Sequence, residues 1–253
     1  MTGRTELKPL FEELDRRADL GDPLQLWLRD DDAVAPSEPL DRLLQLTNHH
    51  GVPTLLAVIP AFTGTELQQR LALEKGVEVA VHGWAHLNHA GAGEKSRELG
   101  MHRPLATVLD ELARGRERLE SLYETRFVPM LVPPWNRIDP AHAALLPDLG
   151  FRGISCFRGY RLGAKGGPAL VNTALDIMDW RVRIGRPAAD LVDEACRLLA
   201  GLRAEAGDGA ALGLLLHHRD HDEAAWAFLE GFLARATAHP AVVHGDPRRL
   251  FGL

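Results

Sequence analysis

Short apolar runs alternate with longer amphipathic segments along most of this chain of 253 residues. The runs are partly β-branched and bounded by Gly, Pro or charged residues, which is typical of buried strands. The intervening segments repeat their apolar residues at helical spacing. The expected strands cover residues 24–28, 54–59, 77–81, 127–132, 153–157, 169–173 and 212–216. The expected helices cover 39–50, 65–75, 104–123, 139–150, 187–205 and 222–238.

About seven β-α units, with no repeated motif and no Pro/Ser-rich linker, predict a single α/β domain over residues 1–253. A distorted or incomplete (β/α) barrel fits this pattern better than an open doubly wound sheet. The first expected strand is followed by "RDDDA" rather than a glycine-rich loop, and these acidic side chains would repel a phosphate. In a barrel, functional residues are expected where the strands end, because those ends and their loops form one face.

The overall charge and the distribution of apolar residues indicate which classes of partner, and which location, to expect. The formal charge is 29 minus 35, or −6, which argues against nucleic acid or an anionic membrane as the main partner. The sequence shows neither a leader-like apolar segment at its start nor an apolar stretch of about 18 residues, so we expect a cytoplasmic protein without a membrane span. The two cysteines, Cys156 and Cys196, are far apart and are expected to be reduced thiols.

Acidic and histidine side chains gather at the ends of three expected strands. Six of the twelve histidines lie at two of these ends, a concentration that core packing does not explain. The first strand continues into Arg29, Asp30, Asp31 and Asp32, the third into His82, His86 and His89, and the seventh into His217, His218 and His221.

This combination predicts a metal site. Three adjacent aspartates repel each other unless a cation or arginines neutralise them. One Asp and two His hold a divalent metal with positions left open for water and substrate, as hydrolytic metals require. Taken alone, "RDDD" is also typical of a helix cap or a solvated loop, and His82 and His86 could be capping or core residues. His89 is either a substrate contact or a solvated loop residue.

Five short motifs, in order, resemble those of the polysaccharide deacetylase family of metal-dependent carbohydrate esterases. The Asp-Asp motif matches Asp31 and Asp32, and the H-[ST]-x-x-H motif matches "HGWAH" from His82 to His86. The Arg-Pro-Pro-aromatic-Gly motif is matched loosely by "VPPWN" (132–136), the Asp-Trp motif by "DIMDW" (176–180), and the final strand-His motif by "LLLHH". The resemblance spans about residues 24 to 221.

The resemblance implies a role for each matched residue. Asp31 would be the general base, and Asp32 would be a metal ligand together with His82 and His86. A register shifted to Asp30 and Asp31 is the alternative within the triple aspartate. His217 would protonate the leaving group, with His218 as the alternative. Asp179 could orient that histidine, unless it is a helix-capping residue beside a core Trp180.

Four residues depart from the family pattern. Val132 stands where the family has an arginine that pairs with the catalytic aspartate, and Arg29 could supply that charge instead. Gly83 replaces the small hydroxyl residue, which removes one hydrogen bond behind the ligands. Trp135 and Asn136 replace the aromatic-glycine pair, and Trp135 could line an acyl pocket or belong to the core.

The resemblance therefore implies a metal-dependent hydrolase that removes an acyl group, in particular acetyl, from an amide or ester. Zn²⁺ is the expected metal, with Fe²⁺, Co²⁺ and Mn²⁺ as alternatives. The expected substrate is a saccharide or small metabolite, because a cytoplasmic location conflicts with cell-wall polymers. The alternatives are an amidohydrolase acting on a non-sugar C–N bond at the same site, and a binding protein that keeps the metal-site scaffold without turnover.

Overall fold

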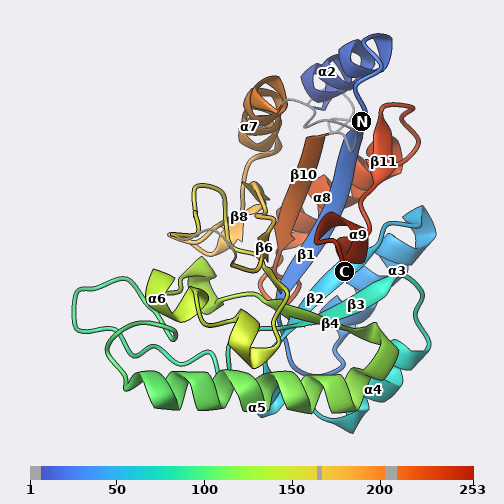
Figure 1. Ribbon diagram of the computed structural model, residues 1–253. Helices are drawn as coiled ribbons and strands as arrows, with labels where there is room; N and C mark the ends of the chain where they lie inside the picture. The colour runs from blue at the N-terminus through green and yellow to red at the C-terminus, as the bar shows by residue number, and fades with distance from the viewer. Residues whose placement is uncertain (1–6, 164–166, 203–209) are drawn as a thin grey trace. The chain divides into compact units, whose positions relative to one another are not determined.

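The computed structural model describes residues 7–163, 167–202 and 210–253 (Figure 1). Its contacts group into two compact units that share the strand β1 (Leu24–Ala33). The strand belongs to the first unit up to Asp30 and to the second from Asp31 onward. The first unit also contains Ser37–Thr54 and Ala174–Asp246, and the second also contains Leu55–Thr173 and Pro247–Leu253.

The first unit is built on parallel strands. In spatial order these are β11 (Val242–His244), β1, β10 (Ala210–Leu216) and β7 (Leu175–Asp176). A short antiparallel hairpin, β8 (Met178–Asp179) and β9 (Ile184–Gly185), follows β7. The helices are α2 (Lys8–Asp19), α3 (Glu38–His50), α7 (Ala188–Gly201) and α8 (Glu223–Ala236). Helices α2 and α7 pack side by side (Figure 1).

The ends of two helices in the first unit follow from their sequence. Ser37 caps α3 by accepting a hydrogen bond from the N–H of Leu40 at 3.3 Å, and Gly51 ends the helix in the left-handed region at φ 63°. Asp222 caps α8 in the same way by accepting from the N–H of Ala225 at 2.9 Å. The expected end of the helix at Gly51 is thus confirmed.

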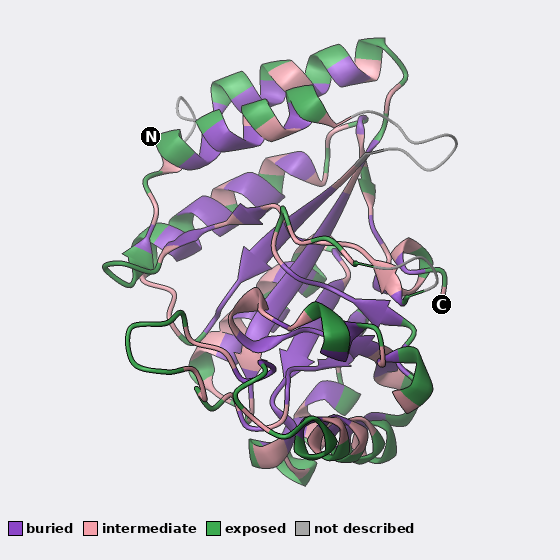
Figure 2. Cartoon of the chain, turned by 60° about the vertical axis from the view of Figure 1, so that its left-hand side comes forward, coloured by how far each residue is buried: buried purple, intermediate pink, exposed green. Residues whose placement is uncertain are grey.

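The second unit carries the strands in the order β6 (Ala169–Leu170), β5 (Gly153–Ile154), β4 (Phe127–Leu131), β3 (Val77–Val81) and β2 (Thr54–Val58). The pairs from β3 to β6 are parallel. Figure 2 shows that the strands are largely buried, as parallel strands covered on both faces are. The helices are α4 (Thr65–Ala72), α5 (Leu105–Tyr123), α6 (Pro140–Ala143) and α9 (Pro247–Leu250), with short 3₁₀ turns η1 (Pro60–Phe62), η2 (Glu124–Arg126), η3 (Pro134–Asn136) and η4 (Pro147–Leu149).

Helix α5 packs against β3 and β4 (Figure 1) and also contacts the loop that follows β3. Its buried residues recur every three or four positions, as the sequence pattern predicts. At Gly115 the helix lies close to two other segments. A Cβ added at Gly115 would lie 3.1 Å from Pro60 in η1 and 3.4 Å from the carbonyl oxygen of Gly83 in the loop after β3. The glycine therefore lets the helix support the residues just after β3.

Several expected elements differ in extent. The expected helix 139–150 is two pieces, α6 and η4, because Pro147 cannot donate the backbone hydrogen bond that would continue the helix. The expected strands 153–157 and 169–173 pair over only two residues each. Helix α2 and strands β7, β8, β9 and β11 were not predicted. Residues 203–205 of the expected helix 187–205 lie outside the described residues.

Two simple expectations can be compared directly with the structure. Neither cysteine forms a disulfide in the described part of the chain; Cys156 is buried and Cys196 is partly exposed. Among the described residues, no helix combines the length and the apolar character that crossing a membrane requires.

Candidate metal centre

The three consecutive aspartates lie on strand β1, with Asp30 in the first unit and Asp31 and Asp32 in the second. Asp30 and Asp31 are buried, while Asp32 keeps about a fifth of its side chain exposed. The backbone of Asp32 has φ 73°, in the left-handed region that non-glycine residues rarely adopt. This turn breaks the strict alternation of side chains along a strand, so the direction of the Asp32 carboxylate does not follow from counting residues along β1.

His82 stands directly after β3 and is held by two backbone groups. Its own N–H donates to the carbonyl oxygen of Val58 at 2.9 Å, which extends the strand pairing by one residue. Its ring Nδ1 lies 2.8 Å from the carbonyl oxygen of Val132. Since a carbonyl only accepts, Nδ1 carries a proton, and Nε2 is the nitrogen left to bind a metal. That Nε2 lies 3.1 Å from Oδ1 of Asp32.

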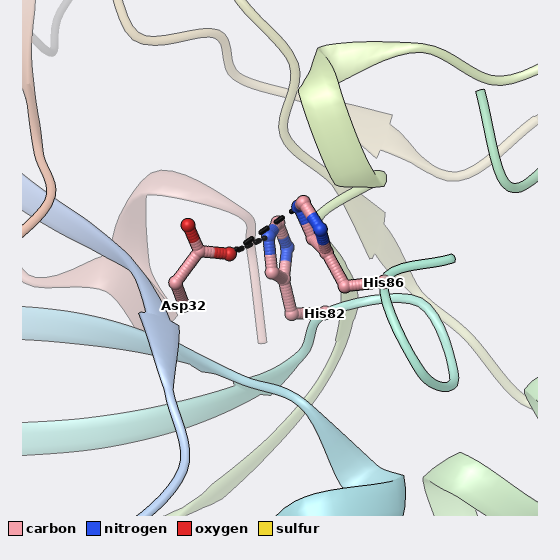
Figure 3. A group of neighbouring side chains, drawn as sticks. All are labelled: Asp32, His82 and His86. Atoms are coloured by element: carbon pink, nitrogen blue, oxygen red, sulfur yellow. Dashed lines mark ion pairs between the residues drawn. The ribbon is translucent and has the colours of Figure 1, made fainter. Parts of the chain in front are cut away.

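His86 reaches the same point from the loop after β3. Its Nε2 lies 3.3 Å from Oδ1 of Asp32, and its ring centroid is 4.2 Å from that of Trp135. Figure 3 shows the three side chains of Asp32, His82 and His86 converging. One ligand atom from each lies within 4.8 Å of the others, and the described part of the chain contains no second group of three that converges in this way.

The charges around the two histidines affect them differently. Burial alone would lower the pKa of His82, but the hydrogen bond to Asp32 and the charges of Asp31 and Asp32 outweigh it and raise that pKa. Burial, and then the neighbouring His82, lower the pKa of His86. The carboxylates thus stabilise positive charge at this point, while His86 favours the neutral form that a metal ligand needs.

The donor set fits a divalent metal. Two imidazole nitrogens and one carboxylate oxygen are the ligands typical of a catalytic zinc site, and the Val132 carbonyl fixes the tautomer of His82 in the way that hydrogen bonds behind metal ligands usually do. Trp135, against the ring of His86, has a left-handed backbone at φ 53°. It therefore lines the centre and is not a fully buried core residue.

Two contributors to this centre were missed by the sequence reasoning. One is the carbonyl oxygen of Val132, because backbone groups carry no sequence signal. The other is Glu98, whose carboxylate is buried against the loop that carries His86. The one sequence signal that pointed toward Glu98 was Gly83, because the hydrogen bond that a hydroxyl residue would make at this position is missing. His89 does not belong to the converging group; its N–H donates to the carbonyl oxygen of Arg97 at 3.0 Å.

Gly83 leads to a direct prediction. Its φ is 62°, and an added Cβ would lie 2.0 Å from Oε2 of Glu98 and 2.6 Å from Cγ of Pro134. The Gly83→Ala variant is therefore expected to lose roughly 2–4 kcal/mol of unfolding free energy, from backbone strain and overpacking together. Gly51→Ala is the matched control, since Gly51 has φ 63° with nothing within 4 Å. Urea unfolding of both variants would separate the two contributions, and equal losses would contradict the predicted clash.

The histidines after β10 lie in the first unit. His218 is buried and bound to Asp30: its backbone N–H donates to Oδ2 of Asp30 at 2.8 Å, and its Nδ1 contacts Oδ1. The backbone N–H of His217 donates to Nε2 of His221 at 3.1 Å, and its ring lies edge-on to that of Trp180 with centroids 4.4 Å apart. Burial lowers the pKa of His221 to about 4, so this third histidine is neutral.

The two remaining predicted residues also lie in the first unit. Arg29 is fully buried in β1. Asp179 accepts hydrogen bonds from Nε of Arg181 at 3.2 Å and from its Nη2 at 3.0 Å, and these bonds lower the pKa of the Asp179 carboxyl. The indole N–H of Trp180 donates to Asp176 at 2.8 Å. The predicted role of Asp179 in orienting His217 stays a prediction.

Several solved structures resemble this chain, and their descriptions include polysaccharide deacetylases and family 4 carbohydrate esterases. A protein from Mycobacterium smegmatis assigned as a polysaccharide deacetylase matches with a TM-score of 0.64 at 18% identity, over 92% of this chain and 90% of that one. A family 4 carbohydrate esterase from Streptomyces lividans, in complex with acetate, matches with 0.57 at 15%, over 87% and 91%. A family 4 pseudoenzyme mutant with restored activity matches with 0.59 at 14%, over 90% and 67%.

These likenesses show the fold, an α/β fold of the incomplete (β/α)-barrel type, as the sequence predicts. A family model described as polysaccharide deacetylase matches residues 26–154, just over half of the chain. The chain belongs to the polysaccharide deacetylase family. No curated protein matches its sequence. The predicted membership is thus confirmed.

Proposed function

We propose that this protein is a metal-dependent deacetylase, which hydrolyses the acetyl group of an amide or ester on a sugar or small metabolite. The observation that carries the proposal is the convergence of Asp32, His82 and His86 beside the buried Asp31. Membership of a deacetylase family supports the reaction type. Zn²⁺ is the proposed metal, because the donor set is one carboxylate and two imidazoles.

Each proposed residue has a task that suits its surroundings. Asp32, His82 and His86 would hold the metal, which when bound would activate a water molecule and polarise the acyl carbonyl. Asp31 would take the proton from the attacking water, acting as general base. Asp31 directly precedes the proposed ligand Asp32 and is buried, and its charge contributes to raising the pKa of His82.

His217 is the proposed acid that protonates the leaving amine or alkoxide. His218 is less suited to this task, because its ring is buried and engaged with Asp30. Arg29 is the proposed source of the positive charge that the family takes from the residue at Val132, and Asp179 the proposed partner that orients His217. A small soluble substrate is proposed because the expected location is the cytoplasm.

The alternative is a binding protein that keeps the scaffold without turnover. It is favoured by Val132, which replaces the family arginine, and by the occurrence of a pseudoenzyme among the similar structures. An amidohydrolase acting on a non-sugar C–N bond would use the same residues. Substrate screening separates it from a sugar deacetylase.

The first experiment is a metal analysis of the purified protein. The wild type is expected to hold close to one equivalent of metal, and the Asp32→Asn/His82→Ala variant none, because two of three ligands are removed. Asp15→Asn/His239→Ala is the matched control, since these residues form another Asp–His pair with His239 Nε2 3.0 Å from Asp15.

The metal-loaded protein would then be screened for acetate release from N-acetyl sugars, O-acetyl sugars and non-sugar N-acetyl amines. Release by the wild type and the control, but not by the double ligand variant, supports the proposal. If no metal is bound even after incubation with Zn²⁺, or if the loaded protein releases no acetate, the binding role replaces it.

A further inference from the structure

Glu98 is a buried carboxylate in the segment between β3 and α5. Only 1% of the residue is exposed, and within the described part of the chain it makes no ion pair. Instead it accepts backbone N–H groups: Oε2 accepts from Trp84 at 3.1 Å, and Oε1 accepts from Ala85 at 2.9 Å and from Leu87 at 3.3 Å. A buried carboxylate is costly unless it is hydrogen-bonded, so these contacts hold both Glu98 and the loop in place.

The three N–H groups belong to the residues around the candidate ligand His86. Ala85 precedes His86 and Leu87 follows it, and both donate to the same oxygen of Glu98. His86 itself has φ 55°, a left-handed conformation that a histidine keeps only when its surroundings impose it. By binding the amide on each side, Glu98 fixes the backbone from which the His86 ring reaches Asp32.

Glu98 also fills a space that other sequences of this type use differently. The motif that "HGWAH" resembles has Ser or Thr at the position of Gly83. Here a Cβ at Gly83 would lie 2.0 Å from Oε2 of Glu98, so the carboxylate occupies the volume of that missing side chain.

We propose that Glu98 is the positioning residue of this metal centre, which holds the loop of residues 83–87 so that His86 can act as a ligand. The part of the proposal that concerns the metal rests on the proposed function. The part that concerns the loop rests only on the three hydrogen bonds to Glu98.

The expected effect differs between two substitutions. Glu98→Ala removes both oxygens and thus all three hydrogen bonds, and it is expected to weaken Zn²⁺ binding roughly 10–100-fold, the usual effect of removing a group that orients a ligand. Glu98→Gln keeps the shape and one acceptor oxygen, so it is expected to lose less. Glu78→Gln is the matched control: Glu78 lies on β3 and binds Arg248 at 3.0 and 2.7 Å, at the opposite end of the strand from His82.

Two measurements test the proposal. Zn²⁺ affinity would be measured by competition with a chromophoric chelator for all four proteins. Hydrogen exchange of the Ala85 and Leu87 amides would be measured on the metal-free proteins, with an expected increase of at least roughly tenfold in Glu98→Ala, a smaller one in Glu98→Gln and none in Glu78→Gln.

Unchanged affinity and unchanged exchange in both Glu98 variants would overturn the proposal and leave the proposed function intact. Faster exchange with unchanged affinity would overturn the positioning role. If the wild type binds no Zn²⁺, the proposed function fails and the positioning role fails with it, while exchange still decides whether Glu98 holds the loop. If Glu98→Ala does not fold, the isosteric Glu98→Gln carries both tests.

Discussion

Asp31→Asn is expected to reduce hydrolysis roughly 10²–10⁴-fold while the protein keeps its metal. The amide has the shape of the carboxylate but cannot accept the proton of the attacking water. The three proposed ligands remain, since Asp31 is not among the groups that converge on His82 and His86. The check is acetate release together with metal content, with the best substrate of the screen.

Asp110→Asn is a suitable control for this variant, because Asp110 is an exposed residue paired with Arg114 on α5. It should keep both activity and metal. Retained hydrolysis in Asp31→Asn would exclude Asp31 as the general base. Loss of the metal would instead make Asp31 a ligand, and the register would shift to Asp30 as base.

Asp30→Asn is expected to cost roughly 3–5 kcal/mol of unfolding free energy without loss of the metal. Asp30 is fully buried and contacts both the backbone N–H and the ring Nδ1 of His218, so replacing its carboxylate weakens two buried polar contacts at once. Urea unfolding and metal analysis of the same preparation would test both halves. Asp15, an exposed carboxylate paired with His239, gives the control, since Asp15→Asn should cost about 1 kcal/mol or less.

The cost of Asp30→Asn should also depend on pH. Burial would raise the pKa of Asp30, but the charge and hydrogen bonds of His218 outweigh it and hold that pKa below its ordinary value of 3.8. A lowered pKa means that the carboxylate stabilises the fold fully above the unfolded pKa and loses this effect as the pH falls through the folded pKa. The difference between wild type and variant should therefore be constant above about pH 5 and shrink below pH 3.8. A difference that grows on acidification would contradict the pairing.

The sequence predicted the parts of this molecule that depend on local pattern. The alternation of apolar runs and helical segments indicated the α/β class, and Gly51 marked the end of α3. His82 could be placed at the end of β3 because an apolar run stops there. The prediction of helix bounds was weakest where a single residue interrupts an otherwise helical apolar pattern. Pro147 does so, and the expected helix 139–150 is divided there.

The candidate site was predictable only in its side chains. Asp32, His82 and His86 were chosen from motif order, and the structure brings these three together. The backbone that aims them was not predictable, because a left-handed turn at Asp32 or His86 has no signature in those residue types. The same holds for Glu98, whose partners are backbone amides distant in sequence and therefore invisible to a motif.

The left-handed backbone of two of the three proposed ligands has a further consequence. Asp32 and His86 hold a backbone conformation that is unfavourable for these residue types. At His86, the hydrogen bonds from Ala85 and Leu87 to Glu98 hold that conformation, so contacts within the chain offset at least part of its conformational cost. We therefore expect the ligand positions to be fixed by the chain. Selectivity among divalent ions would then come from that fixed geometry and from which ion the surroundings supply.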